Sequence, residues 1–169
     1  MNVKGIVYLT GKTNLIEAFG EERWNSFIPK LTAKDKFFSN VIMSVTPIPI
    51  EKFILYLDVM IEEYFNNDMM QYVTIGKAAA KFAVSPEGPY KSYLLTKDIN
   101  QFAESVMPKI YSTYFDEGKP TAKFENNIVH FKSPDLNSNI HTSSTLLWVT
   151  FSKSSKFSGR KQWRKRSGA

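Results

Sequence analysis

Residues 46–65 read TPIPIEKFILYLDVMIEEYF, and this stretch decides the fold class. Its first residues are extended, because a residue that precedes a proline avoids the α region. From Ile50 onward, apolar residues recur at the i, i+3, i+4 and i+7 positions of a helix, with acidic residues between them. The pattern predicts an extended link and then a long amphipathic helix over about 50–64, with one side packed on a core.

Toward the N-terminus, residues 3–9 predict a short strand. Asn14 predicts the N-cap of a helix that begins at Leu15, because asparagine favours that position. We expect Gly20 to be a weak point inside this helix and Pro29 to end it.

Toward the C-terminus, a helix rich in small residues is expected over about 69–84, and Asp98 predicts the N-cap of a further helix. Pro108 lies inside that helix and predicts a kink, because proline removes a backbone hydrogen bond. The period then changes to two, and we read 121–125 and 128–132 as a hairpin joined at Asn126-Asn127. Across that turn, Ala122, Phe124, Ile128 and His130 fall on alternating positions.

These elements predict an α+β fold in which several helices pack on a small antiparallel sheet, with a C-terminal part that is incomplete or atypical. A chain of 169 residues with 43% hydrophobic content has room for one domain with a real core. We assign that domain to residues 1–132. The absence of cysteine excludes a disulfide scaffold and a thiolate metal site. No apolar run is long enough to span a bilayer, and we expect a soluble, cytoplasmic protein.

The charge is concentrated at the C-terminus. Seven of the 22 basic residues and no acidic residue lie in 152–169, which leaves 15 basic against 16 acidic residues in the rest of the chain. A basic tail of this kind could bind nucleic acid or an anionic surface. The residues that would do so are Arg160, Lys161, Arg164, Lys165 and Arg166.

Several short stretches carry a resemblance to a known superfamily. They are Val3-Lys4-Gly5, Gly20-Glu21-Glu22, residues 45–53, Ile75-Gly76-Lys77, residues 102–114 with Pro108, and Glu125-Asn126-Asn127. In these the chain resembles the superfamily of heme-nitric-oxide-binding (H-NOX) domains, vinyl-reductase-like domains and TRAPP-type trafficking subunits. It is most similar to a family of unknown function that is abundant in myxobacteria. The resemblance covers about residues 1–132.

The resemblance implies helices stacked on a sheet around a cavity for an apolar ligand, and homodimers that are common among its members. Heme binding in the H-NOX branch needs a histidine on the helix that corresponds to 99–114, and this chain has none there. The tyrosine-serine-arginine element that holds the heme propionates has no counterpart either. We therefore expect no heme and no other cofactor.

The same resemblance calls for a long helix and a last strand after the hairpin, and residues 133–169 show neither pattern. Degenerate back-translation from the third base of the Trp148 codon permits a shifted frame that reads as an amphipathic helix followed by a Gly-Ala-Lys turn. Two readings stay open: a genuine basic tail, or a frame-shifted C-terminus. The coding DNA distinguishes them.

Candidate chemistry along the chain is sparse. Glu62-Glu63 and Asp116-Glu117 are carboxylate pairs, which could hold a metal ion or exchange protons, but their positions on helix surfaces favour solvated faces. A hydrophobic pocket is the better candidate site, between the 69–84 helix and the 99–114 helix, where Ala79, Ala80 and Ala103 leave space. We expect it to be lined by Phe82, Tyr93, Phe102, Val106 and Ile110.

The sequence thus predicts a non-enzymatic ligand-binding, sensory or interaction module with a hydrophobic pocket. The alternative is a protein that binds nucleic acid or an anionic surface through its basic tail. No set of residues supports a named reaction. An unfinished sheet edge would favour a homodimer.

Overall fold

The computed structural model of the chain describes residues 1–83, 85, 90–92, 98–126 and 128–132. Helices and two small antiparallel sheets make up this part, which confirms the α+β class. The helices are α1 (Gly5–Phe19), α2 (Glu21–Lys34), η1 (Lys36–Ser39), α3 (Ile50–Phe65), α4 (Met70–Ala83), α5 (Ile99–Gln101), η3 (Phe102–Val106) and α6 (Met107–Tyr114). The strands are β1 (Asn2–Lys4), β2 (Pro47–Pro49), β3 (Thr121–Glu125) and β4 (Ile128–Lys132). The predictions for Tyr93 and for the tail 133–169 lie outside the described residues.

The extended link and the long helix form as the sequence predicts. The link becomes β2, which pairs with β1 so that Val3 faces Ile48 across the sheet. Both of these side chains are fully buried. The helix α3 follows at once, and its apolar side supplies Tyr56, Val59 and Ile61 to the core. Asn66 then ends it in the left-handed conformation, which asparagine tolerates better than most residues.

The first helix begins earlier than predicted, and the strand is shorter. Only Asn2–Lys4 are extended, and α1 starts at Gly5. The amides of Gly5 and Ile6 donate to the carbonyls of Thr46 and Ser44, at 2.8 and 2.9 Å, so the turn before β2 satisfies the helix start. The prediction that Asn14 caps this helix was therefore wrong, since Asn14 lies inside α1.

The helix break falls at Gly20 and not at Pro29. Gly20 has a φ of 90°, a conformation that residues with a Cβ atom rarely adopt, and it separates α1 from α2. Pro29 lies inside α2. It is exposed, and so is Asn25, whose carbonyl loses its usual partner. Water can satisfy that carbonyl, which explains why the helix continues through the proline.

The hairpin has the predicted boundaries, with Asn126 at a φ of 52° in its turn. Its register places Ala122 opposite Phe131 and Phe124 opposite Val129. Because cross-strand partners share a face, the core side consists of these residues and not of Ala122 with His130. His130 is exposed on the other side.

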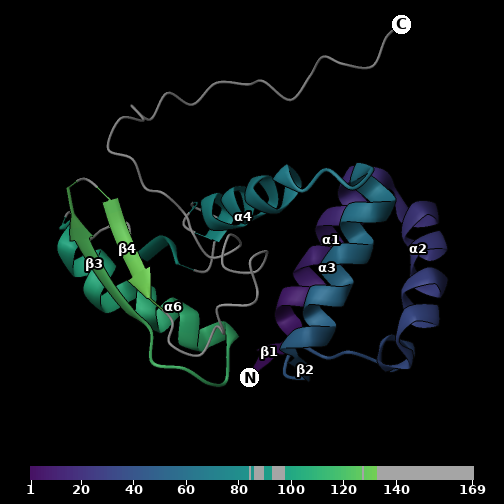
Figure 1. Cartoon of the computed structure of the whole chain (residues 1–169), viewed down its shortest axis with the longest axis horizontal. Helices are drawn as coiled ribbons and strands as arrows, with labels where there is room; N and C mark the ends of the chain where they lie inside the picture. Colours follow the sequence, from purple (N-terminus) through teal and green to yellow (C-terminus); the bar gives the residue numbers. More distant parts are fainter. Residues whose placement is uncertain (84, 86–89, 93–97, 127, 133–169) are drawn as a thin grey trace, which may run out of the picture.

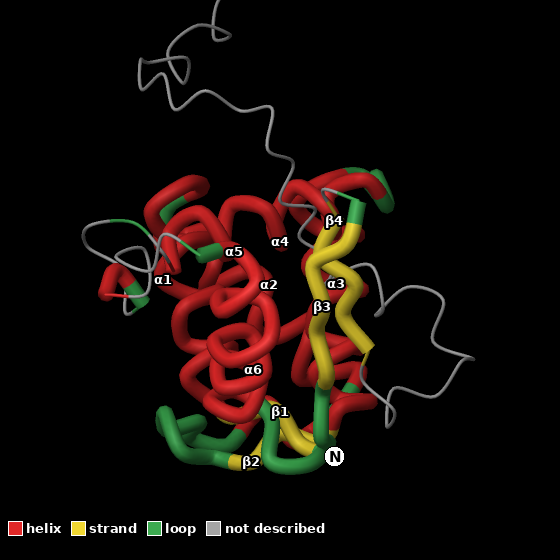
Figure 2. The backbone as a smooth tube through the Cα atoms, turned by 90° about the vertical axis from the view of Figure 1, so that its left-hand side faces the viewer, coloured by secondary structure: helices red, strands yellow, loops and turns green. Residues whose placement is uncertain are grey.

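Two hydrophobic clusters organise the described part of the chain. One joins α1, α2 and α3 and includes Tyr8, Phe27 and Tyr56. The other joins η3, α6 and the hairpin and includes Ala103, Tyr111 and Phe131. Figure 1 shows α1, α2 and α3 on one side and the hairpin on the other, and Figure 2 shows β1 and β2 together at one end, beside α6. The N-terminal strand touches both groups, since Val3 also forms a bridge to Phe115.

None of the described helices combines the length and the apolar composition that a bilayer span requires.

Candidate ligand site

The helix that carries most of the predicted pocket residues contains a π-helical turn. Asp98 caps its start, because its carboxylate accepts from the amide of Asn100 at 2.9 Å. In η3, the amide of Met107 donates to the carbonyl of Phe102, five residues back. Pro108 follows directly and has no amide to donate to Glu104. The predicted kink therefore takes the form of a widened turn, a feature that occurs frequently at functional sites.

Three of the predicted pocket residues lie on this helix. Phe102 and Val106 are buried, at 8% and 6% exposure, and Ile110 is half-buried. They are spaced four residues apart, as is Tyr114, and follow one another along η3 and α6. We call these four side chains the stripe. The side chain of Phe82 on α4, like all of Tyr93, falls outside the described residues.

Aromatic rings pack along the same helix. Tyr90 is buried and meets Tyr114 edge-to-face, with ring centroids 6.1 Å apart. Burial, and then a hydrogen bond to Tyr90, raise the pKa of the Tyr114 hydroxyl. On the hairpin side, Tyr111 stacks on Phe115 at 4.5 Å and packs against Phe131 at 5.8 Å. The described side chains of the site are therefore mainly apolar, with the hydroxyls of Tyr90 and Tyr114 as polar groups among them.

The small residues of the expected gap are described in part. Ala103 is fully buried in the cluster with Tyr111 and Phe131, so its side faces the hairpin. Ala79 on α4 is exposed, and the side chain of Ala80 is outside the described residues. Ala79 and Ala103 thus differ in exposure, and the gap between α4 and the helix over 99–114 stays a prediction.

A shallow depression lies where α6 meets β1. Its lining comprises Lys4, Pro108, Lys109, Ser112 and Thr113. The hydroxyls of Ser112 and Thr113 donate to helix carbonyls, at 3.0 and 2.9 Å. The depression therefore presents mainly the two lysine side chains to solvent, and it shares no residue with the stripe.

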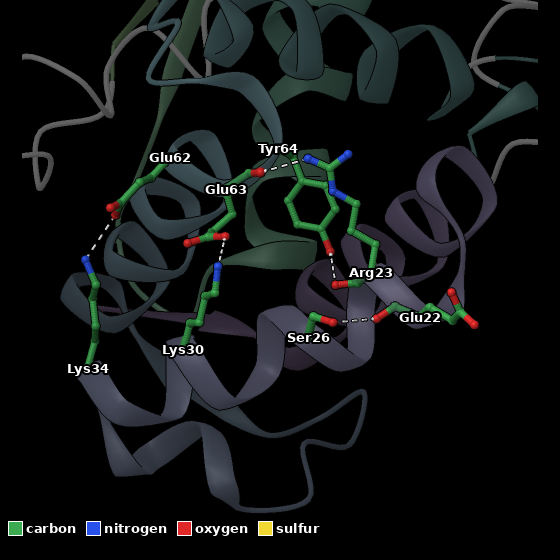
Figure 3. A network of polar contacts seen from close by, with 8 residues as sticks. All are labelled: Glu22, Arg23, Ser26, Lys30, Lys34, Glu62, Glu63 and Tyr64. Atoms are coloured by element: carbon green, nitrogen blue, oxygen red, sulfur yellow. Dashed lines mark hydrogen bonds and ion pairs between the residues drawn. The ribbon is translucent and has the colours of Figure 1, made fainter.

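The candidate carboxylate pair on α3 has a structural role. Glu62 forms an ion pair with Lys34 at 3.0 Å, and Glu63 forms one with Lys30 at 2.5 Å (Figure 3). Both lysines belong to α2, so the pair fastens α2 to α3. The other pair is also engaged: Asp116 accepts from Asn2, and Glu117 meets the terminal amine of Met1 at 3.2 Å.

We next consider the described residues that could ligate a metal ion or a heme iron. No group of three or more histidine, cysteine, aspartate or glutamate residues in it could hold a metal ion. The helix over 99–114 offers no histidine. Met107 on it has a sulfur that could in principle ligate iron, but it packs against the hairpin cluster. The residues of this helix therefore do not fit a heme of the H-NOX type.

The exposed surface holds a feature that sequence reasoning missed. In the loop between η1 and β2, Val41, Met43 and Val45 are 87%, 61% and 74% exposed, while Ile42 between them is buried. Apolar residues at positions 41, 43 and 45 are typical of a strand that buries this side. The sequence pattern therefore does not indicate that these three side chains face solvent.

The chain has no match among models of protein families, among curated proteins or among solved structures.

Proposed function

We propose that this protein is a non-enzymatic binding module that holds a small apolar ligand against the stripe of Phe102, Val106 and Ile110. The observation that carries the proposal is the π-helical turn before Pro108. A widened turn costs hydrogen-bond geometry, and it coincides here with the residues that the sequence predicts for the pocket. The aromatic rings of Tyr90 and Tyr114 extend the same apolar surface.

The chemistry of the stripe suits binding better than catalysis. Its aliphatic and aromatic side chains can exclude water from an apolar molecule. Because the pKa of Tyr114 is raised, its hydroxyl stays protonated at neutral pH and can orient a ligand by hydrogen bonding. It is a poor general base for the same reason.

Membership of the superfamily of H-NOX, vinyl-reductase-like and TRAPP-type domains is part of this proposal. The support for it is the order of elements, with a short strand, helices, an extended link, a long helix, a helix interrupted at a proline, and a hairpin. The resemblance of the sequence motifs supports it further. In that superfamily the ligand would lie between the helical group and the hairpin group.

Binding of the neutral dye Nile red tests the proposal, because its emission rises in an apolar site. The wild-type chain should bind it saturably. Ile110→Trp fills the stripe and should weaken binding by about tenfold or more, since an overfilled site expels its ligand. Ser112→Trp is the matched control, because Ser112 is exposed and lies two residues, or about 200° around α6, from Ile110. Equal effects of the two variants, or no saturable binding, would contradict the proposal.

The basic tail carries the second candidate function, binding of nucleic acid or an anionic surface. Seven basic residues without an acidic one are the observation that favours it. Removal of residues after Thr150 should abolish salt-sensitive binding of DNA or RNA and leave Nile red binding intact. If the coding DNA shows a shifted frame, the tail loses this role.

A further inference from the structure

The loop over 40–46 presents a row of apolar side chains to solvent. Val41, Met43 and Val45 are all more than half exposed. Ile6, at the start of α1, adds a fourth apolar side chain at the same end at 39% exposure. Exposed apolar side chains that gather in one place commonly mark an interaction site.

The loop is held firmly in this position. The amide of Met43 donates to the Thr46 hydroxyl at 2.9 Å, and the amide of Thr46 donates to the Met43 carbonyl at 3.0 Å. The carbonyls of Ser44 and Thr46 receive the first two amides of α1. A Cβ atom on Gly5 would lie 2.1 Å from the Met43 carbonyl, so loop and helix start are in close contact. These hydrogen bonds fix the backbone of the loop in the conformation that exposes Val41, Met43 and Val45.

Cationic side chains lie beside the row. Lys4 pairs with Pro47 in the β1–β2 sheet and so lies close to the end of the loop. With Lys109 it lines the shallow depression on α6. Neither lysine has an ion pair among the described residues. The carboxylates of Asp116 and Glu117 at this end are bound to Asn2 and to the terminal amine.

We propose that this end of the molecule docks peripherally on an anionic lipid surface, with Val41, Met43 and Val45 inserted and Lys4 and Lys109 on the headgroups. Apolar side chains beside unpaired lysines match the two layers of such a surface. Figures 1 and 2 show the loop beside β1 and β2, at the end where α6 meets the N-terminal strand. This inference does not depend on the ligand stripe or on the tail.

Site-specific fluorescence tests it on the full chain. The chain has no cysteine, so Met43→Cys gives a single labelling position. Met69→Cys is the matched control, because Met69 is also exposed, at 53%, but lies in the turn between α3 and α4 at the other end of α3. A nitrobenzoxadiazole label at position 43 should shift to the blue and escape iodide quenching on phosphatidylcholine–phosphatidylserine vesicles. The label at position 69 should do neither.

Two sets of substitutions separate the two parts of the surface. Val41→Ser, Met43→Ser and Val45→Ser together should lower sedimentation with those vesicles by about tenfold, with an unchanged unfolding midpoint because the three side chains are exposed. Lys4→Gln with Lys109→Gln should lower it only when phosphatidylserine is present.

Three outcomes would overturn the proposal. If the protein sediments with vesicles while neither label shifts, the basic tail alone binds them. If the label at position 43 is shielded without vesicles as protein concentration rises, the row is an interface with a second copy. If wild type and triple variant bind alike, the row takes no part.

Discussion

Asn2 and Asp116 are 114 positions apart in the chain and are joined by two hydrogen bonds to one carboxylate. The backbone amide of Asn2 donates to one oxygen at 2.6 Å, and its side-chain amide donates to the other at 2.7 Å. The amide of Asp116 returns a bond to the Asn2 carbonyl at 3.2 Å. These contacts fasten β1, which belongs to the α1–α3 group, to the chain that leaves α6.

Asp116→Asn should weaken this fastening. The pKa of the Asp116 carboxyl lies below its ordinary value because of the bonds from the backbone and then the side chain of Asn2. A lowered folded-state pKa contributes stability that is present above the unfolded value and is lost as pH falls through the folded value. At neutral pH we expect a loss of about 0.5–1 kcal/mol, discounted for exposure. Urea unfolding at pH 7 and pH 3 measures it, and the difference from wild type should shrink at the lower pH.

Glu125→Gln is the control for this pair, since it removes an exposed carboxylate from the hairpin. It should change the free energy of unfolding little at either pH. A difference between Asp116→Asn and wild type that is independent of pH would contradict the assigned role of the carboxylate.

Tyr56→Phe should raise the stability of the α1–α3 group. The Tyr56 side chain is 1% exposed, and its hydroxyl has no hydrogen-bond partner among the described residues. An unsatisfied buried hydroxyl costs about 1–3 kcal/mol, and phenylalanine keeps the ring contacts. We expect a gain of about 1 kcal/mol in urea unfolding. Tyr72→Phe is the contrast, because the Tyr72 hydroxyl donates to Asp58, and its loss should destabilise by a similar amount.

Gly11→Ala tests the contact between α1 and the same Tyr56 hydroxyl. A Cβ atom on Gly11 would lie 2.6 Å from the Tyr56 hydroxyl oxygen, closer than real contacts allow. Alanine in a helix normally gains about 0.5–1 kcal/mol over glycine, but here we expect a loss. In the Tyr56→Phe background the next atom lies 3.6 Å away, so the substitution should become neutral or favourable. A double-mutant cycle by urea unfolding measures the coupling, and additive effects would refute the contact.

The sequence predicts those parts of the fold in which one periodicity holds over a whole element. The apolar repeat from Ile50 predicts α3, and the alternation around Asn126 predicts the hairpin. The N-terminal region differs, because the β-branched and aromatic run near Tyr8 resembles a strand, while the contact of Gly5 with the 43–46 turn makes it a helix. Local preference was overridden there by a partner about 40 residues away.

Prediction of the candidate site was limited in the same way. The four-residue spacing of Phe102, Val106 and Ile110 predicts that they lie on one helix, and Pro108 predicts an irregular turn in it. The location of Ala103 against the hairpin depends on which side of the helix the sheet covers, which periodicity alone does not decide. The exposed row on the 40–46 loop also depends on tertiary packing, since Ile42 takes the buried place.

Pro108→Ala should change ligand affinity and the free energy of unfolding in different directions. With an amide restored at position 108, the π-helical turn can close to a regular helix, which rotates Phe102 relative to Ile110 by about 100°. We expect Nile red affinity to fall by about tenfold or more, because Phe102 changes its orientation relative to Val106 and Ile110. The free energy of unfolding should stay level or rise by up to about 1 kcal/mol, because proline is unfavourable inside a helix. Dye titration and urea unfolding on the same preparation measure both quantities.

Pro29→Ala provides the matched control, because Pro29 also lies inside a helix, on the exposed side of α2. It should gain stability in the same way and leave dye binding unchanged. If Pro108→Ala keeps full affinity, the widened turn does not shape the site and the stripe is ordinary core packing. If both variants lose affinity together, the loss reflects the helices in general and not the geometry at Phe102. Only a loss confined to Pro108→Ala ties the π-helical turn to the ligand.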